Sequence, residues 1–330
     1  MSLIEVKHLY KQYDVAKRQE GMWGAVRSLF HREYLSKMAV QDISFTIKAG
    51  EVVGYIGPNG AGKSTTIKML TGILVPTSGD ILINGIVPYK ERQKNARQIG
   101  VVFGQRTQLW WDLPAIESFE LLKQVFQIPQ QRYRKNMDTF AEILGLGEFM
   151  QTPVRQLSLG QRMRADIAAS LLHDPSILFL DEPTIGLDVV AKERMRTFIK
   201  EINQERGVTV ILTTHDMSDI EKLCRRMILI DKGQVMYDGE LAKIKEKFGQ
   251  HRLLIIDLEG EESGFSMAGA EVIREEGNRK WLRFNRRQIS ASQLINQISE
   301  RYEIKDLAIS DPEIDEMIRQ IYEKGIDQIV

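Results

Sequence analysis

A glycine-rich stretch with a lysine and two hydroxyl residues at fixed spacing offers the clearest chemistry in the sequence. It reads Gly57, Pro58, Asn59, Gly60, Ala61, Gly62, Lys63, Ser64, Thr65. Glycines let the backbone curl so that successive N–H groups can face an anion, and a helix after the loop would add its positive N-terminal end. At this spacing Lys63 can reach the β- and γ-phosphates, and Ser64 can ligate Mg²⁺. We therefore interpret residues 57–65 as a phosphate loop for a nucleoside triphosphate with Mg²⁺.

Two adjacent carboxylates, Asp181 and Glu182, follow the apolar run at 177–180. Sheets with parallel strands bind their ligands at the carboxyl ends of those strands. We expect Asp181 to hold Mg²⁺ through water and Glu182 to act as the general base that polarises an attacking water. Paired acids can also cap a helix, but the phosphate loop in the same chain favours the catalytic interpretation.

The elements that must position these residues can be predicted from hydrophobic periodicity. The apolar segment before the phosphate loop and the helical pattern after it give the strand–loop–helix context that such a loop needs. Two apolar strands, 176–182 and 208–216, flank a helical segment at 188–204, and this βαβ unit implies a parallel sheet. We predict an α/β fold with a parallel core sheet.

Further segments predict two subdomains and an appendage. Residues 3–10, 40–47 and 79–86 alternate like strands or carry a hairpin signal, which favours an antiparallel β subdomain beside the phosphate loop. From about 114 to 173 the pattern is helical. Beyond Gly239 the hydrophobic pattern changes to that of short strands and helices, so we expect a small α+β domain at 240–330.

Bulk properties limit the possible functions. A chain of 330 residues suggests two domains at roughly 100–200 residues each. Lysine plus arginine equals aspartate plus glutamate at 45 each, so no nucleic-acid partner is expected. The one cysteine, Cys224, excludes an internal disulfide. No apolar run approaches the ~18 residues of a membrane span, so we expect a soluble chain.

A second anion site is predicted at residues 157–161, which read LSLGQ. Ser158 is a good N-cap for the helix that follows, and the N–H groups at the start of that helix can bind an anion. Because the phosphate loop already forms one phosphate site, this second site implies a second subunit.

At this point the sequence resembles the ATP-binding cassette (ABC) family, whose signature is LSGGQ, over residues from about 3 to 239. The resemblance implies two cassettes stacked head to tail, with each ATP between the phosphate loop of one and the signature of the other. It also implies residue roles: an aromatic on adenine, signature contacts, a Q-loop glutamine that also ligates Mg²⁺, a D-loop aspartate and a switch histidine at the γ-phosphate. Tyr13 matches the aromatic residue, and Ser158, Gly160 and Gln161 match the signature contacts. Gln105 matches the Q-loop glutamine, Asp188 the D-loop aspartate and His215 the switch histidine.

Two departures from the family pattern stand out. Leucine occupies the third signature position, Leu159. A helix N-terminus uses ordinary φ angles, so we expect weakened catalysis at most. Gly104 precedes the glutamine of the Q-loop, and only alignment from the LWWDL segment at 109–113 recovers Gln105.

Two segments have sequences suited to contact with a membrane or a partner protein. The insertion at 17–37 carries five basic and two acidic residues, and five apolar residues share one helical face: Met22, Trp23, Val26, Leu29 and Phe30. This face could lie on a membrane surface, grip a transmembrane subunit, or fold onto the protein's own sheet. Trp110 and Trp111 follow the Q-loop and could be anchors for a partner or local core.

The resemblance implies the ATP-hydrolysing subunit of an ABC transporter, peripheral at the cytoplasmic face of the cell membrane. Its partners would be separately encoded transmembrane permease subunits, and the single cassette, the insertion and the appendage look most like bacterial export systems. The alternative is a soluble ABC ATPase of translation or DNA metabolism. The single phosphate loop and the absence of sustained heptads disfavour that alternative.

Overall fold

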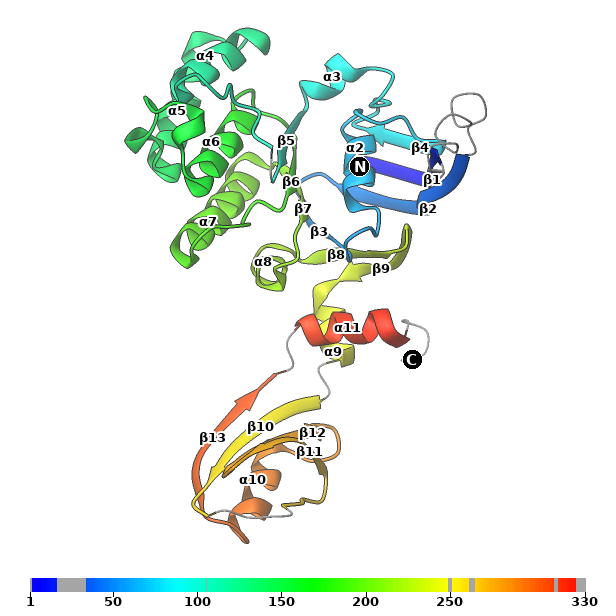
Figure 1. Ribbon diagram of the computed structural model, residues 1–330, viewed down its shortest axis with the longest axis vertical. Coiled ribbons are helices and arrows are strands. Elements are labelled where there is room, and N and C mark those ends of the chain that lie inside the picture. The colour runs from blue at the N-terminus through cyan, green and yellow to red at the C-terminus, as the bar shows by residue number, and fades with distance from the viewer. Residues whose placement is uncertain are drawn as a thin grey trace, which may run out of the picture. The chain divides into compact units, whose positions relative to one another are not determined.

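The computed structural model describes residues 2–16, 34–104, 106–248, 251–260, 265–311 and 314–324. The chain forms two compact units, Met1–Gly239 and Glu240–Val330 (Figure 1). Each has its own set of sheets and helices. Unit 1 contains every described residue that the sequence analysis selected for chemistry.

The core of unit 1 is a six-stranded sheet in the order β5-β6-β7-β3-β8-β9. Its strands are β3 (Val52–Ile56), β5 (Ile99–Phe103), β6 (Ile177–Asp181), β7 (Thr209–Thr213), β8 (Arg226–Asp231) and β9 (Gln234–Glu240). The first five strands run parallel. Every residue of β7 is buried, as expected for a parallel strand covered on both faces. The predicted α/β fold with a parallel core sheet is confirmed.

Helices connect the strands of unit 1. They include α2 (Lys63–Leu70), α3 (Arg92–Ala96), α7 (Val189–Arg206) and α8 (Met217–Leu223). Of these, α2, α7 and α8 directly follow strands of the six-stranded sheet, whereas α3 precedes β5. Local sequence sets both ends of α7. The Asp188 carboxylate accepts a hydrogen bond from the Ala191 N–H at 2.8 Å, and Gly207 ends the helix in the left-handed conformation. The α7 crossover therefore delivers β7 alongside β6.

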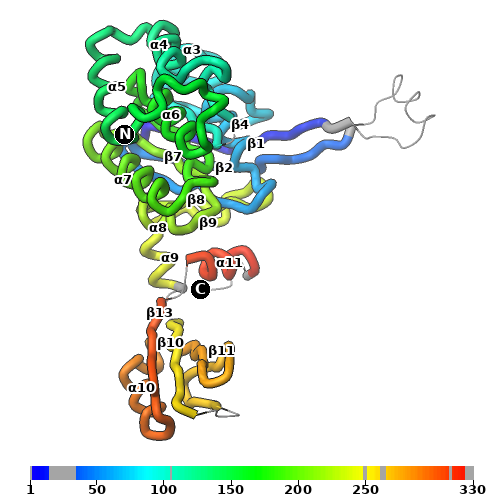
Figure 2. The backbone as a smooth tube through the Cα atoms, turned by 60° about the vertical axis from the view of Figure 1, so that its left-hand side comes forward, coloured from blue at the N-terminus to red at the C-terminus, as the bar shows by residue number. Residues whose placement is uncertain are grey.

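A second, antiparallel sheet in unit 1 has the order β2-β1-β4 and confirms the predicted β subdomain. Its strands are β1 (Ser2–Ala16), β2 (Tyr34–Lys48) and β4 (Ser78–Ile83). Pairing with β4 ends at Tyr10 and Ser78, so the far half of β1 pairs only with β2. Figure 2 shows this half as a two-stranded ribbon that projects from unit 1.

The ribbon corrects the predicted extent of the insertion at 17–37. Residues 34–37 belong to β2 and pair with β1, with Tyr34 opposite Ala16 and Lys37 opposite Tyr13. A four-residue overlap with a helical pattern is too short to outweigh cross-strand pairing. Residues 17–33, with the five apolar residues of the expected helical face, lie outside the described residues.

The helical part of unit 1 contains α4 (Ala115–Val125), α5 (Gln130–Leu144), α6 (Leu159–Leu171) and two short 3₁₀ helices, η1 (Leu146–Glu148) and η2 (Val154–Gln156). It confirms the expected helical pattern of this region. The α6 helix contacts α4, α5 and β5.

Trp110 and Trp111 are 42% and 49% exposed, so the local-core alternative for these two residues is wrong.

Unit 2 is built on a four-stranded antiparallel sheet in the order β11-β12-β10-β13. Its elements are α9 (Leu241–Phe248), β10 (His251–Leu258), β11 (Ala270–Glu276), β12 (Arg279–Asn285), α10 (Ala291–Ser299), β13 (Ile304–Ser310) and α11 (Ile314–Lys324). Alternate β10 residues, Leu254, Ile256 and Leu258, pack with Leu294 and Ile298 of α10. The α9 and α11 helices contact each other. Among the described helices of both units, none has the length and hydrophobicity needed to cross a bilayer.

Candidate active site

The phosphate loop, residues 57–65, connects β3 to α2, and close backbone contacts require two of its glycines. A Cβ atom on Gly57 would lie 2.5 Å from the Ile230 carbonyl oxygen, and one on Gly62 would lie 2.5 Å from the Ala39 carbonyl oxygen. Gly62 also has a φ of 104°. Within the described residues no side chain caps the start of α2, so the N–H groups of its first turn lack a side-chain acceptor. The loop can therefore direct backbone donors at an anion.

Two segments distant in sequence support the phosphate loop. The Gly233 N–H, in the turn between β8 and β9, donates to the Ala61 carbonyl at 3.0 Å. The Gln41 N–H of β2 donates to the Gly233 carbonyl at 2.7 Å. The sequence analysis missed this support because backbone contacts leave no motif, although the pair Lys232-Gly233 is a recognisable turn signal.

Lys63 lies across the phosphate loop. Its ammonium donates to the carbonyls of Gly57 at 2.5 Å and Pro58 at 3.2 Å. Burial lowers the pKa of Lys63, and the nearby carboxylates of Glu182 and Asp181 partly offset this effect because they favour the cation. The lysine therefore lies within electrostatic range of the acidic pair.

The acidic pair follows β6, as the sequence predicted. The Thr213 hydroxyl at the end of β7 donates to Asp181 and fixes its carboxylate. Glu182 has a φ of 55°, and its N–H donates to the Thr213 carbonyl at 2.9 Å. This left-handed conformation costs a non-glycine residue roughly 1–2 kcal/mol, and it turns the Glu182 side chain out of the strand direction.

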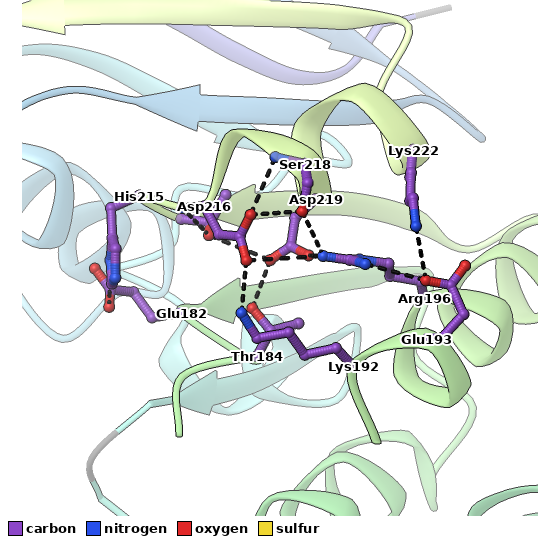
Figure 3. A network of polar contacts seen from close by, with 11 residues as sticks. Glu182, Thr184, Lys192, Glu193, Arg196, His215, Asp216, Ser218, Asp219 and Lys222 are labelled. Atoms are coloured by element: carbon purple, nitrogen blue, oxygen red, sulfur yellow. Dashed lines mark hydrogen bonds and ion pairs between the residues drawn. The ribbon is translucent and has the colours of Figure 1, made fainter. Parts of the chain in front are cut away.

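His215 contacts Glu182. Its Nδ1 atom lies 3.0 Å from the Glu182 Oε2 atom, and the histidine side chain is 70% exposed (Figure 3). The two residues meet because β6 and β7 pair in parallel with Asp181 opposite Thr213. Each lies just beyond the carboxyl end of its strand. The structure thus brings Glu182, His215, Asp181 and Lys63 together.

Gly104 explains the irregular start of the Q-loop. A Cβ atom at this position would lie 2.5 Å from the Asp181 carbonyl oxygen and 3.4 Å from the Glu182 Cβ atom. Only glycine lets the chain leave β5 this close to the acidic pair. Gln105, the next residue, lies outside the described residues.

The signature residues form the start of α6. The Ser158 hydroxyl accepts from the Gln161 N–H at 3.2 Å, and the Gln161 side chain accepts from the Ser158 N–H at 2.9 Å, which is a capping box. Leu159 has helical backbone, as expected for a helix N-terminus. A Cβ atom on Gly160 would approach the Leu187 Cδ2 atom at 3.2 Å.

Leu159 packs onto the 183–188 segment, which includes residues 185–188 (IGLD), the D-loop of the resemblance. A Cβ atom on Gly186 would lie only 2.3 Å from the Leu159 Cδ2 atom, and Gly186 has a φ of 69°. The unusual signature leucine therefore fills space that a glycine in the D-loop leaves open. Asp188, at the end of this segment, uses its side chain to cap α7.

The elements divide the selected residues into two groups. The phosphate loop, Asp181, Glu182 and His215 gather around α2 and the ends of β6 and β7, whereas Ser158 lies on α6, which packs with the helical part. Tyr13 lies in β1, where the Lys11 ammonium is 5.2 Å from its ring centroid. Tyr13 pairs with Lys37 of β2, whereas Lys11 pairs with Val40, the neighbour of the Ala39 that lies against Gly62.

The donor set around the phosphate loop suits Mg²⁺. Asp181 and Ser64 offer oxygen atoms, the ligand type that this ion prefers. Within the described residues, no three histidine, cysteine, aspartate or glutamate side chains gather into a metal site. These oxygens fit an ion that takes most of its ligands from phosphate and water.

Comparison with known proteins identifies the family. A profile of the family described as "ABC transporter" matches residues 40–185. The linearmycin resistance ATP-binding protein LnrL of Bacillus subtilis (strain 168) is 34% identical over 237 residues, which cover 72% of this chain and 76% of LnrL. The methionine import ATP-binding protein MetN of Latilactobacillus sakei subsp. sakei (strain 23K) is 33% identical over 299 residues, which cover 86% of this chain and 85% of MetN.

A solved structure shows the same fold. It is a dimeric post-hydrolysis state of an ATP-binding cassette bound to ADP and Pi, with a TM-score of 0.59 and 28% sequence identity. The match covers 72% of this chain and 98% of the cassette. Together with the profile and the relatives, it confirms the resemblance inferred from the motifs. The chain belongs to the ATP-binding and ATP-hydrolysing subunits of the ABC transporter family.

Proposed function

We propose that this chain hydrolyses ATP with Glu182 as general base and His215 as its partner at the γ-phosphate. The observation that carries the proposal is the 3.0 Å contact between the two side chains at the ends of neighbouring parallel strands. A carboxylate in this position can orient an attacking water and accept its proton. The imidazole beside the carboxylate would limit the orientations that Glu182 can take.

Further residues would hold the nucleotide. In this proposal, Lys63 and the backbone N–H groups of residues 57–65 bind phosphate oxygens, and Tyr13 stacks on adenine. Asp181, Ser64 and Gln105 would hold Mg²⁺, which neutralises phosphate charge when bound. The Thr213 hydroxyl would keep the Asp181 carboxylate turned toward the ion.

A second copy of the cassette, or a paralogue, would complete each site. Ser158, Gly160 and Gln161 lie at the start of α6, which packs against α4, α5 and β5. We propose that they serve the ATP of the partner cassette. Asp188, which ends the 183–188 segment beside the signature, would approach the same interface. The dimeric state of the similar solved cassette supports this arrangement.

We propose that residues 1–239 form the ATP-binding domain and residues 240–330 an accessory domain, and that the ATPase drives separately encoded permease subunits at the cytoplasmic face of the membrane. The exposed Trp110 and Trp111 support a partner contact beside the Q-loop. Residues 17–33, the part of the predicted insertion at 17–37 that lies outside β2, would add a membrane-surface contact.

Export is the direction that we propose, and the name of LnrL, a resistance protein, supports it. The name of MetN states import, and MetN is matched over more of this chain. The two names disagree on direction, so identification of the permease that co-purifies with the chain tests the proposal of export.

A pull-down tests the transporter function. The Glu182→Gln protein with ATP should be incubated with detergent-solubilised native membranes, and the co-purifying proteins identified. Recovery of multi-span permease subunits is expected. Recovery of ribosomes or DNA-bound complexes, without any membrane protein, would instead assign the chain to the soluble ABC ATPases. Lys63→Ala, which removes the phosphate-loop cation, serves as the nucleotide-binding control.

A further inference from the structure

We propose that Asp219 is a positioning residue that couples the 183–188 segment to the loop carrying His215. Asp219 lies in α8 and is fully buried at 0% exposure. This inference rests on the catalytic roles proposed above for Glu182 and His215. Asp219 contacts neither the nucleotide site nor His215 directly and would act through the residues that its carboxylate binds.

The Asp219 carboxylate joins three elements that meet beside the Glu182–His215 pair (Figure 3). Its Oδ2 atom accepts from the Thr184 hydroxyl at 2.5 Å and from the Thr214 hydroxyl at 3.3 Å. Its Oδ1 atom accepts from the Arg196 Nε atom of α7 at 2.6 Å. Thr184 is two residues after Glu182, and Thr214 directly precedes His215.

Arg196 extends the connection to α7, which follows the 183–188 segment. Arg196 is 6% exposed, and its guanidinium also donates to the Ser218 hydroxyl at 2.7 Å. Lys192, one turn earlier on α7, donates to Asp216 at 2.6 Å. Asp216 directly follows His215, so both neighbours of the histidine belong to this network.

The geometry gives the network a role beyond stability. The 183–188 segment is connected at its start through Thr184 and beyond its end through α7, and both connections lead to α8. A shift of that segment must therefore move Asp219 and, through Thr214 and Asp216, the backbone at His215. Buried charged pairs transmit such shifts because breaking their hydrogen bonds leaves an unpaired charge.

Thr184→Val is the most direct test because it removes only one hydroxyl and keeps the side-chain shape. We expect kcat for ATP hydrolysis to fall about ten-fold to a hundred-fold, as for loss of supporting hydrogen bonds around reactive groups. The KM for ATP should stay within about two-fold of the wild-type value, because Thr184 does not touch the phosphate loop. Thr184→Ser, which restores the hydroxyl, should recover most of kcat.

Thr209→Val is the matched control. Thr209 is also fully buried, and its hydroxyl accepts one hydrogen bond, from the Gly50 N–H at 2.8 Å, but it lies at the opposite end of β7 from the active site. It should lose stability comparably while keeping wild-type kcat per folded molecule. Wild-type kcat in Thr184→Val, or an equal loss in both valine variants, would overturn the role of Asp219.

A combined variant tests the path through Asp219. If Thr184 acts through this carboxylate, Thr184→Val added to Asp219→Asn should lower kcat no further than Asp219→Asn alone. Multiplying losses would contradict the path. Glu182→Gln, assayed in parallel, separates the two claims: full turnover there overturns the proposed base, whereas lost turnover with an unaffected Thr184→Val overturns only the positioning role.

Discussion

The Nδ1 atom of His215 lies 3.0 Å from the Oε2 atom of Glu182, across the carboxyl ends of β7 and β6. Glu182 reaches this contact from a left-handed backbone conformation, which the hydrogen bond from its N–H to Thr213 supports. Because His215 is mostly exposed, its orientation depends on this contact and on the loop that carries it. A change at either residue should therefore alter catalysis more than folding.

His215→Ala should lower kcat for ATP hydrolysis by about a hundred-fold or more and leave ATP affinity nearly unchanged, because the loss affects how Glu182 is held rather than the phosphate loop. Phosphate release and binding of a fluorescent ATP analogue measure the two quantities. His8→Ala is the matched control, since His8 Nδ1 lies 2.8 Å from an Asp42 carboxylate on the antiparallel sheet. Equal kcat losses in both variants would contradict a specific role for His215.

Gly186→Ala should reduce ATPase activity because it adds a methyl group where the Leu159 Cδ2 atom already lies and strains a left-handed φ. The strain alone is worth about 1–2 kcal/mol. Adding Leu159→Ala should restore part of the activity, since it removes the clash but not the strain. ATPase rates of the single and double variants measure whether the clash with Leu159 contributes to the loss of activity. A double variant no more active than Gly186→Ala would show that packing of the signature leucine is irrelevant.

Asp166→Asn should change how stability depends on pH. Burial raises the pKa of Asp166 from its ordinary value of 3.8 to about 6, against hydrogen bonds from Thr107 and Gln108 that favour the carboxylate. The folded protein then binds more protons than the unfolded chain between about pH 4 and pH 6, so the wild-type free energy of unfolding falls as pH rises through this window.

The asparagine variant lacks this loss. Its advantage in free energy of unfolding over the wild type should grow by up to about 3 kcal/mol between pH 4 and pH 7. Thermal unfolding at several pH values measures the difference. Asp138→Asn, at an exposed position on α5, provides the control and should follow the wild-type pH dependence. A constant difference between Asp166→Asn and wild type would contradict the raised pKa.

Local motifs account for the part of the site that could be predicted. The phosphate loop and the Asp181-Glu182 pair are contiguous in sequence, and each sits at the junction of a strand with the next element. The contact between Glu182 and His215 also follows once β6 and β7 are recognised as neighbouring parallel strands. The helical pattern at 188–204 predicts α7, and the structure shows that Asp188 and Gly207 set its boundaries as capping residues.

Long-range contacts account for what was missed. Arg196 and Asp219 lie on different helices, and neither belongs to a motif, so no spacing reveals that they meet. Period-two alternation is clear only from residue 40, so the sequence predicts the start of β2 there. Cross-strand pairing with Tyr13 and its neighbours extends that strand back to Tyr34. Gly104 departs from the family pattern because a Cβ atom there would meet the Asp181 carbonyl, a long-range contact that no local spacing reveals.

ATP turnover by Glu182→Gln tests the central claim most directly. The variant keeps the phosphate loop and the shape of the side chain but loses the proposed base, so kcat should fall by about 10²–10⁴-fold. It should still bind ATP and, with Mg²⁺ and ATP, elute as a dimer in size-exclusion chromatography. Wild-type turnover by the purified variant would remove Glu182 from the mechanism and contradict the account of this site.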